Sequence, residues 1–145
     1  MTTVSEVMTR GVRALGPRDT VVAAAQAMDE LNVGAIPVCE GDTLLGMVTD
    51  RDIVVRAVAQ DIDARAVTLA EVMSRPVRTV GEDEDVEEAL ATMSEHQIRR
   101  IPVADGQGRL VGMLSLGDIA AKDPDNDTGL AMSLADISSP AAPDR

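Results

Sequence analysis

The chain has 145 residues, a formal net charge of -12 and no Phe, Trp or Tyr. This charge repels nucleic acid and anionic membranes, and without aromatic rings the chain lacks the groups on which single-stranded nucleic acids stack. We therefore expect neither nucleic acid nor membrane as a partner. Hydrophobic residues make up 45% of the chain, so a globular fold is expected, with a core of aliphatic side chains and methionine.

The N-terminus lacks a signal-peptide pattern, and no apolar run approaches the roughly 20 residues that cross a bilayer, so we expect a soluble cytoplasmic protein. Cys39 is the single cysteine, which excludes an intramolecular disulfide and a thiolate metal cluster. We expect Cys39 to be a small buried strand residue. His96 is the single histidine and is expected at a solvated helix end. These residues predict no metal site and no catalytic set.

Spacing and turn residues predict five elements in the first half of the chain. In chain order these are an extended segment at 12–15, an amphipathic helix from about 21, strands at 36–38 and 44–48, and a helix over about 50–59. A Gly-containing turn joins the two strands, which indicates a hairpin. Pro37 within the first of them indicates a strand end or an edge strand.

The same elements recur in the second half, because the sequence is duplicated at an offset of 65 that becomes 66 after a one-residue insertion. The clearest matches pair Glu6-Val7-Met8 with Glu71-Val72-Met73, Ile36-Pro37-Val38 with Ile101-Pro102-Val103, Gly46-Met47 with Gly112-Met113, and Asp52-Ile53 with Asp118-Ile119. The predicted elements are an extended segment at 77–80, a helix from about 86, strands at 101–103 and 110–114, and a helix at 116–122.

Each repeat is thus β-α-β-β-α, and at about 60 residues it is small for an independent domain. We expect an α/β (α+β) fold in which the two repeats pack sheet to sheet about a pseudo-twofold axis. The predicted domains are residues 4–60 and 69–122, joined by a polar linker at 61–68. The polar tail at 123–145 is expected to contain at most one short helix, at 130–137.

The Glu-Val-Met opening, the Ile-Pro-Val strand and the stretch Gly-Met-Val-Thr-Asp-Arg-Asp-Ile at 46–53 resemble the cystathionine-β-synthase-like (CBS) domain family. The resemblance covers about residues 4–122. It is closest to the small stand-alone CBS-pair proteins of bacteria, among them the hypoxic response proteins. It implies a disc-like pair with two clefts, adenine nucleotides bound in those clefts, and dimerisation through the helices.

Thr49 and Asp52 lie three residues apart at a predicted strand-to-helix junction, and this spacing has two interpretations. In one, Thr49 caps the helix and Asp52 complements its dipole, without a ligand. In the other, free N–H groups and a hydroxyl at the helix start bind phosphate, and Arg51 adds a cation. The resemblance to the family then assigns Thr49 to phosphate and Asp52 to ribose.

The second repeat keeps the hydroxyl and the carboxylate as Ser115 and Asp118, but has Gly117 where the first has Arg51. We expect a weaker phosphate site here unless Arg99 or Arg100 compensates, and a capped helix without ligand is slightly favoured. The adenine ring would lie between aliphatic groups. The family analogy points to Val12, Ile36 and Pro37 in one cleft and to Val77, Ile101 and Pro102 in the other, where core packing is the alternative role.

The sequence therefore predicts a regulatory module that senses AMP, ADP or ATP in an inter-domain cleft, with NAD or S-adenosylmethionine as second choices and no required cofactor. It would act through a homodimer formed by helical faces, or through a regulated partner protein. One alternative is a ligand-free interaction module. A nucleotide-hydrolysing enzyme that binds Mg²⁺ through Asp50 and Asp52 is disfavoured, because the sequence offers no base, nucleophile or lid.

Overall fold

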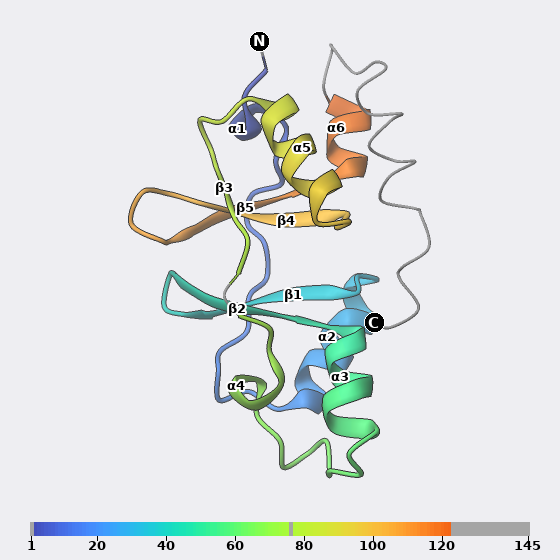
Figure 1. Cartoon of the computed structure of the whole chain (residues 1–145). Helices are drawn as coiled ribbons and strands as arrows, with labels where there is room; N and C mark the ends of the chain where they lie inside the picture. Colours follow the sequence, from blue (N-terminus) through green and yellow to red (C-terminus); the bar gives the residue numbers. More distant parts are fainter. Residues whose placement is uncertain (1, 76, 123–145) are drawn as a thin grey trace. The chain divides into compact units, whose positions relative to one another are not determined.

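The structure, a computed structural model, describes residues 2–75 and 77–122 and divides into two compact units (Figure 1). Unit 1 consists of Met1–Gly11, Thr79–Gly106 and Val111–Arg145, and unit 2 of Val12–Arg78 and Gln107–Leu110. The units do not coincide with the two sequence repeats. Unit 1 joins the opening residues of the first repeat to most of the second repeat. Unit 2 joins the opening residues of the second repeat to most of the first repeat. The helix predicted at 130–137 lies outside the described residues.

Both units combine helices with a small sheet, which confirms the predicted α+β class (Figure 1). The elements of unit 2 are α2 (Val21–Leu31), β1 (Ala35–Glu40), β2 (Thr43–Thr49), α3 (Asp50–Ile53), the π-helix η1 (Val54–Val58) and α4 (Leu69–Val72). The elements of unit 1 are α1 (Val4–Val7), β3 (Val80–Gly81), α5 (Val86–Glu95), β4 (Arg100–Ala104), β5 (Leu110–Ser115) and α6 (Leu116–Lys122).

The predicted hairpins form in both units. In unit 2, β1 and β2 pair antiparallel in a two-stranded sheet, with Ala35 opposite Thr49 and Ile36 opposite Val48. Both strands of such a sheet are edges, so Pro37 is tolerated within β1. In unit 1 the order is β3-β4-β5, and β3 runs parallel to β4.

The extended segments predicted at 12–15 and 77–80 form less strand than expected. In unit 2, Leu15 makes an isolated parallel bridge to Val38. A turn then begins at Gly16, whose N–H donates to the carboxylate of Asp19 at 2.7 Å and whose carbonyl accepts the Asp19 N–H at 3.2 Å. Because Pro17 has no N–H to continue a ladder, the pairing ends there. In unit 1 the pairing is limited to β3.

The segment predicted as a linker, 61–68, is part of unit 2. Val67 is 4% exposed, and its carbonyl accepts the N–H of Val21 at 3.0 Å. The carbonyl of Ala64 accepts the N–H of Val22 at 3.2 Å. The first N–H groups of a helix have no partner within it, so this segment supplies the carbonyls that α2 needs.

Two one-turn helices, α1 and α4, were not predicted, although each begins with a capping box. Thr3 and Glu6 form the box of α1, and Thr68 and Glu71 form that of α4. Hydrogen bonds from the backbone and side chain of Thr68 hold the pKa of Glu71 below its usual value. The sequence signal was the repeated spacing of a Thr three residues before a Glu.

The core divides into two clusters of aliphatic side chains and methionine, one in each unit, as the composition predicted. Val4 and Val7 of α1 lie in the cluster of unit 1, whereas Leu69 and Val72 of α4 lie in that of unit 2. The opening segment of each repeat thus fills the core built around the other repeat's helices and hairpin.

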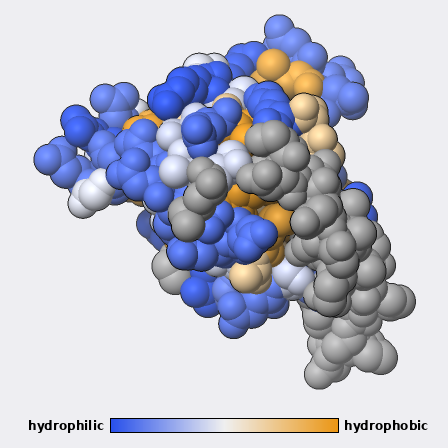
Figure 2. All heavy atoms as spheres, turned by 90° about the horizontal axis from the view of Figure 1, so that it is seen from above, coloured by the Kyte–Doolittle hydropathy of each residue, from blue (hydrophilic) through white to orange (hydrophobic). Residues whose placement is uncertain are grey.

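The described residues on the face in Figure 2 are mostly hydrophilic, with smaller hydrophobic areas between them. No helix in the two described ranges has the length and apolar character needed to span a membrane.

Cys39 is 7% exposed and lies at a register shift in β1, next to Val38. Burial raises the pKa of its thiol, and the nearby carboxylate of Asp42 raises it further. A thiol whose pKa is raised carries less of the reactive thiolate.

We therefore predict that Cys39 of the folded protein reacts with iodoacetamide at pH 8 much more slowly than the same residue in urea. Burial restricts access of the reagent to the Cys39 thiol, and the raised pKa of this thiol lowers the fraction present as thiolate. Mass spectrometry of the alkylated fraction over time measures both rates. Equal rates would show that Cys39 is accessible and its thiolate available.

Gly46 in β2 and Gly112 in β5 lie where another segment crosses the hairpin. A Cβ on Gly46 would be 2.8 Å from Sδ of Met73 and 2.9 Å from the carbonyl oxygen of Ser74. On Gly112 it would be 2.8 Å from Sδ of Met8 and 2.8 Å from the carbonyl oxygen of Thr9. The methionine can move, but the backbone carbonyl cannot move without breaking its pairing.

We predict that Gly46→Ala lowers the free energy of unfolding by about 1–3 kcal/mol, because the added methyl group overpacks this crossing. Gly106→Ala is the matched control, since a Cβ there meets nothing within 4 Å. Urea unfolding followed by circular dichroism measures both variants. Equal stability of the two variants would contradict the close approach.

Candidate ligand-binding site

The junction between β2 and α3 is a capping box formed by two of the predicted site residues. Thr49 ends β2 and is the N-cap of α3, with φ -114° and ψ 164°. Its hydroxyl oxygen accepts the N–H of Asp52 at 3.0 Å, and Oδ2 of Asp52 accepts the N–H of Thr49 at 2.9 Å. The capping interpretation therefore describes the local structure, and any ligand would have to use what these bonds leave available.

Asp52 is 8% exposed and is the one buried charged residue in the described part of the chain. Its second oxygen, Oδ1, accepts the hydroxyl of Ser74 at 3.0 Å. Nε of Arg56, one helical turn further on, lies 4.0 Å from the same oxygen. A buried carboxylate needs such partners because desolvation penalises its charge.

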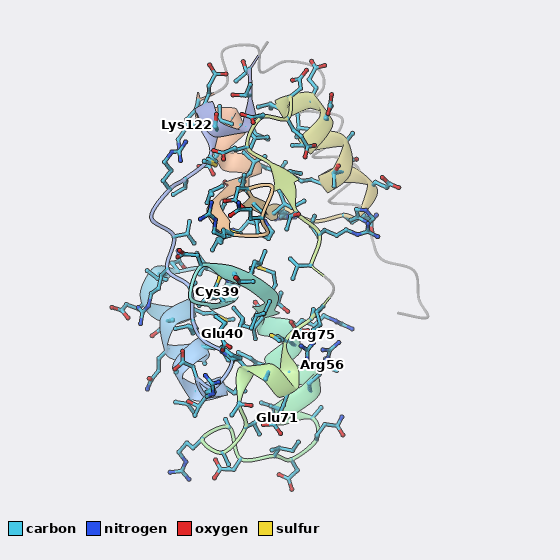
Figure 3. The ribbon with its side chains drawn as sticks, turned by 90° about the vertical axis from the view of Figure 1, so that its left-hand side faces the viewer. Cys39, Glu40, Arg56, Glu71, Arg75 and Lys122 are labelled. Atoms are coloured by element: carbon cyan, nitrogen blue, oxygen red, sulfur yellow. The ribbon has the colours of Figure 1, made fainter. Side chains whose placement is uncertain are left out.

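Arg56 also forms hydrogen bonds to the backbone at the end of α4. Its Nη1 donates to the carbonyls of Val72 and Met73, both at 3.1 Å, and the side chain reaches toward this segment (Figure 3). These carbonyls end the single turn of α4 and would otherwise lack a partner within the helix. We refer to Thr49, Asp52, Arg56 and Ser74 as the Asp52 network.

The N–H groups expected to be free for phosphate at the start of α3 are already bonded. The carbonyl of Gly34 accepts the Asp50 N–H at 3.0 Å, and the Asp50 carboxylate accepts the Arg51 N–H at 2.8 Å. The Asp52 N–H is bonded to Thr49. That expectation is corrected: the groups that remain for an anion are the hydroxyl hydrogen of Thr49 and the exposed guanidinium of Arg51.

Unit 1 repeats the arrangement around Asp118. Ser115 and Asp118 form the reciprocal bonds, at 3.0 and 3.1 Å. The hydroxyl of Thr9 donates to Oδ1 of Asp118 at 3.1 Å, and Nζ of Lys122 lies 3.3 Å from the same oxygen. Lys122 thus replaces Arg56, and Thr9 replaces Ser74.

Sequence reasoning found Thr49, Asp52, Ser115 and Asp118 but missed their partners. The signal was present in the duplication, because Thr9 and Ser74 are equivalent hydroxyls, as Arg56 and Lys122 are equivalent cations. Nothing in the spacing showed that a side chain 22 residues away from Asp52, or 109 residues away from Asp118, would reach the carboxylate.

The predicted adenine-contact residues are divided between the two units. Ile36 and Pro37 are buried in β1 of unit 2, and Val12 is half-buried in the same unit. Ile101 and Pro102 are buried in β4 of unit 1, whereas half-buried Val77 belongs to unit 2. Burial of the Ile-Pro pairs agrees with core packing, which was the alternative role.

A groove of about 600 Å³ in unit 1 contains none of the predicted site residues. Its lining is strongly acidic and comprises Thr79, Val80, Gly81, Glu82, Asp83, Glu84, Asp85, Glu88, Ala104, Asp105 and Gly106. These carboxylates repel phosphate, so the groove is not suited to a nucleotide.

The CBS domain model matches the chain twice, at residues 4–58 and 69–125. This chain is a pair of CBS domains. The matches cover both repeats, so the resemblance drawn from the Ile-Pro-Val strands and the junction stretch is confirmed.

Known CBS-pair proteins resemble the chain over most of its length. Hypoxic response protein 1 of Mycobacterium tuberculosis is 40% identical over 127 residues, which cover 87% of this chain and 88% of that protein. The CBS domain-containing protein YhcV of Bacillus subtilis is 41% identical over 128 residues, covering 88% and 90%.

Solved structures of CBS pairs superpose well on the chain. Hypoxic Response Protein I with two coordinated zinc ions has a TM-score of 0.75 at 41% identity and covers 83% of this chain and 98% of that one. The CBS domain pair of MJ0100 with 5'-methylthioadenosine and S-adenosyl-L-methionine has a TM-score of 0.72 at 30% identity, covering 83% and 94%. CBSX2 in complex with AMP has a TM-score of 0.73 at 25% identity, covering 83% and 95%.

Hypoxic Response Protein I was solved with two coordinated zinc ions. Among the residues described for this chain, no three His, Cys, Asp or Glu side chains form a group that could hold a metal ion.

We predict that Ser74→Ala lowers the free energy of unfolding by about 1–3 kcal/mol, because Asp52 loses a hydrogen bond while it stays buried. Ser74→Thr is the matched control, since Thr9 makes the same bond at the equivalent position in unit 1. Chemical denaturation measures both. If the two variants are equally stable, the bond from Ser74 does not support Asp52.

Proposed function

We propose that this CBS pair is a regulatory module that binds an adenine nucleotide, AMP, ADP or ATP, at the β2–α3 junction of unit 2. The observation that carries the proposal is the pairing of Thr49 with a buried Asp52 in a fold whose solved neighbours hold AMP, 5'-methylthioadenosine and S-adenosylmethionine. These three ligands share adenine and a ribose ring with 2'- and 3'-hydroxyls. We assign the ribose hydroxyls to Asp52 and the phosphate to Thr49 and Arg51.

Asp52 can accept the ribose hydroxyls without giving up its present bonds. Each carboxylate oxygen has two acceptor positions. Oδ2 uses one for the Thr49 N–H, and Oδ1 uses one for the Ser74 hydroxyl. One acceptor position therefore remains on each oxygen, which matches the two hydroxyls of a ribose.

The phosphate would be held by side chains rather than by helix N–H groups. Thr49 accepts a hydrogen bond through its oxygen and keeps its own hydrogen to donate to a phosphate oxygen. Arg51 is exposed and two residues further along, and its guanidinium binds phosphate through two parallel bonds. Half-buried Val12 of the same unit would supply an aliphatic contact to adenine, whereas the buried side chains of Ile36 and Pro37 would contact the ring only if binding opens the edge of β1.

The equivalent junction of unit 1 is proposed as the weaker site. Gly117 supplies no cation where unit 2 has Arg51. Its remaining groups in unit 1 are Ser115, Asp118, Ile101 and Pro102.

Binding would change the activity of the protein only by favouring one state over another. A ligand shifts an equilibrium by the difference between its affinities for the two states. We propose that those states are assembly states of a homodimer formed by helical faces, or complexes with a regulated partner protein in the cytoplasm. No catalytic step is proposed for the module.

A thermal-shift and calorimetric titration with AMP, ADP and ATP tests the proposal, with NAD and S-adenosylmethionine as further ligands. A ligand at 100 times its Kd stabilises by about 2.7 kcal/mol, which raises Tm by several degrees. We predict that Asp52→Ala and Thr49→Ala lower affinity at least tenfold, because each removes a direct contact and one contact is worth about 1.4 kcal/mol or more.

Both substitutions also remove a helix cap, so the controls must lose a cap elsewhere. Thr20 caps α2 by accepting the Ala23 N–H at 3.2 Å, and Asp85 caps α5 by accepting the Glu87 N–H at 3.1 Å. Thr20→Ala and Asp85→Ala should destabilise the fold and keep nucleotide affinity. Loss of affinity in all four variants would mean that stability, not contact, controls binding.

A ligand-free interaction module is the second candidate, and the capping box within the junction favours it. The capping box satisfies Thr49 and Asp52 without a ligand. Absence of any thermal shift with every nucleotide at millimolar concentration would make this the function.

A further inference from the structure

In each unit, one residue with a hydroxyl holds the junction carboxylate and also pairs with the second strand of the hairpin. In unit 1 the side chain of Thr9 donates to Oδ1 of Asp118 at 3.1 Å. The backbone of Thr9 exchanges two hydrogen bonds with Met113 of β5, at 2.8 and 3.0 Å. Ser74 makes the equivalent bonds in unit 2. Each of these residues is therefore fixed just before the chain leaves its unit.

Five residues separate Thr9 from the point where the chain pairs with β1 of unit 2. The chain enters unit 2 at Val12 and reaches Leu15. The Leu15 N–H donates to the Pro37 carbonyl at 3.0 Å, and the Cys39 N–H donates to the Leu15 carbonyl at 2.8 Å. Pro37 is one of the residues predicted to contact adenine, so the chain that begins at the unit 1 carboxylate ends beside the unit 2 site.

The second crossing repeats this connection in the opposite direction. Five residues also separate Ser74 from Val80, the first residue of β3 in unit 1. Val80 lies opposite Val103 of β4, which follows Pro102 in sequence. The carboxylate of each unit is thus connected, through one hydroxyl and one short segment, to the strand that carries the Ile-Pro pair of the other unit.

The pairing at Leu15 is an isolated bridge, so it depends on how the preceding segment is held. Gly11 lies in this segment with φ +67°, and a Cβ there would meet nothing within 4 Å. The ion pair of Arg13 with Glu30 is exposed and therefore contributes little. Anchoring one end of a short flexible segment reduces the conformational entropy that is lost when its other end pairs. Thr9 supplies that anchor.

We propose that Thr9 and Ser74 are positioning residues that couple the two junctions. Each orients the carboxylate of its own unit and, through the segment that follows it, the Ile-Pro strand of the other unit. A ligand that fixes one carboxylate then favours the binding-competent arrangement of the other site, and this coupling is reciprocal. The inference rests on the proposed function for its ligand and specifies how the two sites communicate.

Amide exchange without nucleotide tests the connection. Thr9→Val removes the hydroxyl and keeps the shape of the side chain. We predict that the Leu15 and Cys39 N–H groups, both in unit 2, exchange about threefold to tenfold faster, because the loss of one hydrogen bond changes a local opening equilibrium by this factor. Thr9→Ser keeps the hydroxyl and should exchange at the wild-type rate. NMR spectroscopy measures the rates.

Thr92→Val is the matched control, because it removes a hydroxyl of unit 1 that bonds within α5, to the Glu88 carbonyl at 3.2 Å. It should leave both unit 2 amides unchanged. Equal exchange in Thr9→Val and wild type would overturn the inference. Equal acceleration in Thr9→Val and Thr92→Val would also overturn it, because exchange would then follow general stability. If Thr9→Val does not fold, two glycines inserted after Gly11 lengthen the segment and should speed exchange of the same amides.

An AMP titration tests the coupling itself. The NMR shift of the Arg51 amide reports binding at unit 2. Thr9→Val should raise the Kd of AMP there about threefold to tenfold, although Thr9 belongs to unit 1, and Thr92→Val should not. An unchanged Kd in Thr9→Val would overturn the coupling. If AMP binds neither unit, the proposed function is refuted, whereas faster exchange in Thr9→Val would still establish the connection between the units.

Discussion

The most consequential interaction in the structure is the bonding of one carboxylate in each unit, that of buried Asp52 in unit 2 and that of half-buried Asp118 in unit 1. Asp52 joins the start of α3 to the chain that leaves α4, through the N–H of Thr49 and the hydroxyl of Ser74. Asp118 joins the start of α6 to the chain that leaves α1, through Ser115 and Thr9. A charged group held away from water is costly unless each oxygen has partners, so these bonds fix where the opening segment of each repeat crosses the hairpin.

The crossing also depends on glycine. Gly46 and Gly112 allow Met73 and Met8 to pack directly on the hairpins, and the backbones of the crossing segments pair with β2 and β5 at Met47 and Met113. The hydroxyl that reaches the carboxylate belongs to the residue that makes this pairing. Packing, backbone pairing and carboxylate bonding therefore act on the same few residues, and a ligand at Asp52 would contact the group that holds the crossing in place.

The sequence predicted the features that depend on local pattern. Apolar spacing located α2 and α5, the Ile-Pro-Val motifs located β1 and β4, and the spacing of Thr49 and Asp52 predicted the cap. It did not predict which repeat each opening segment would join, because Glu6-Val7-Met8 and Glu71-Val72-Met73 are the same tripeptide, and their sequence does not distinguish one core from the other. For the same reason the contributions of Ser74 and Thr9 to the site were missed. Both residues belong to opening segments that pack in the unit built mainly from the other repeat, and the spacing along the sequence does not show this packing.

The exchange of opening segments has a consequence for how such a chain can arise. A single repeat contains every part that one unit needs, namely a short opening helix, a long helix, a hairpin and a capped final helix. Two identical single-repeat chains could therefore build the same two units by trading their first residues, as domain-swapped dimers do. In the present protein the two repeats belong to one chain, so the opening segments are exchanged within one molecule. Once joined, the repeats no longer had to remain alike, and one of them could hold Arg51 where the other has Gly117.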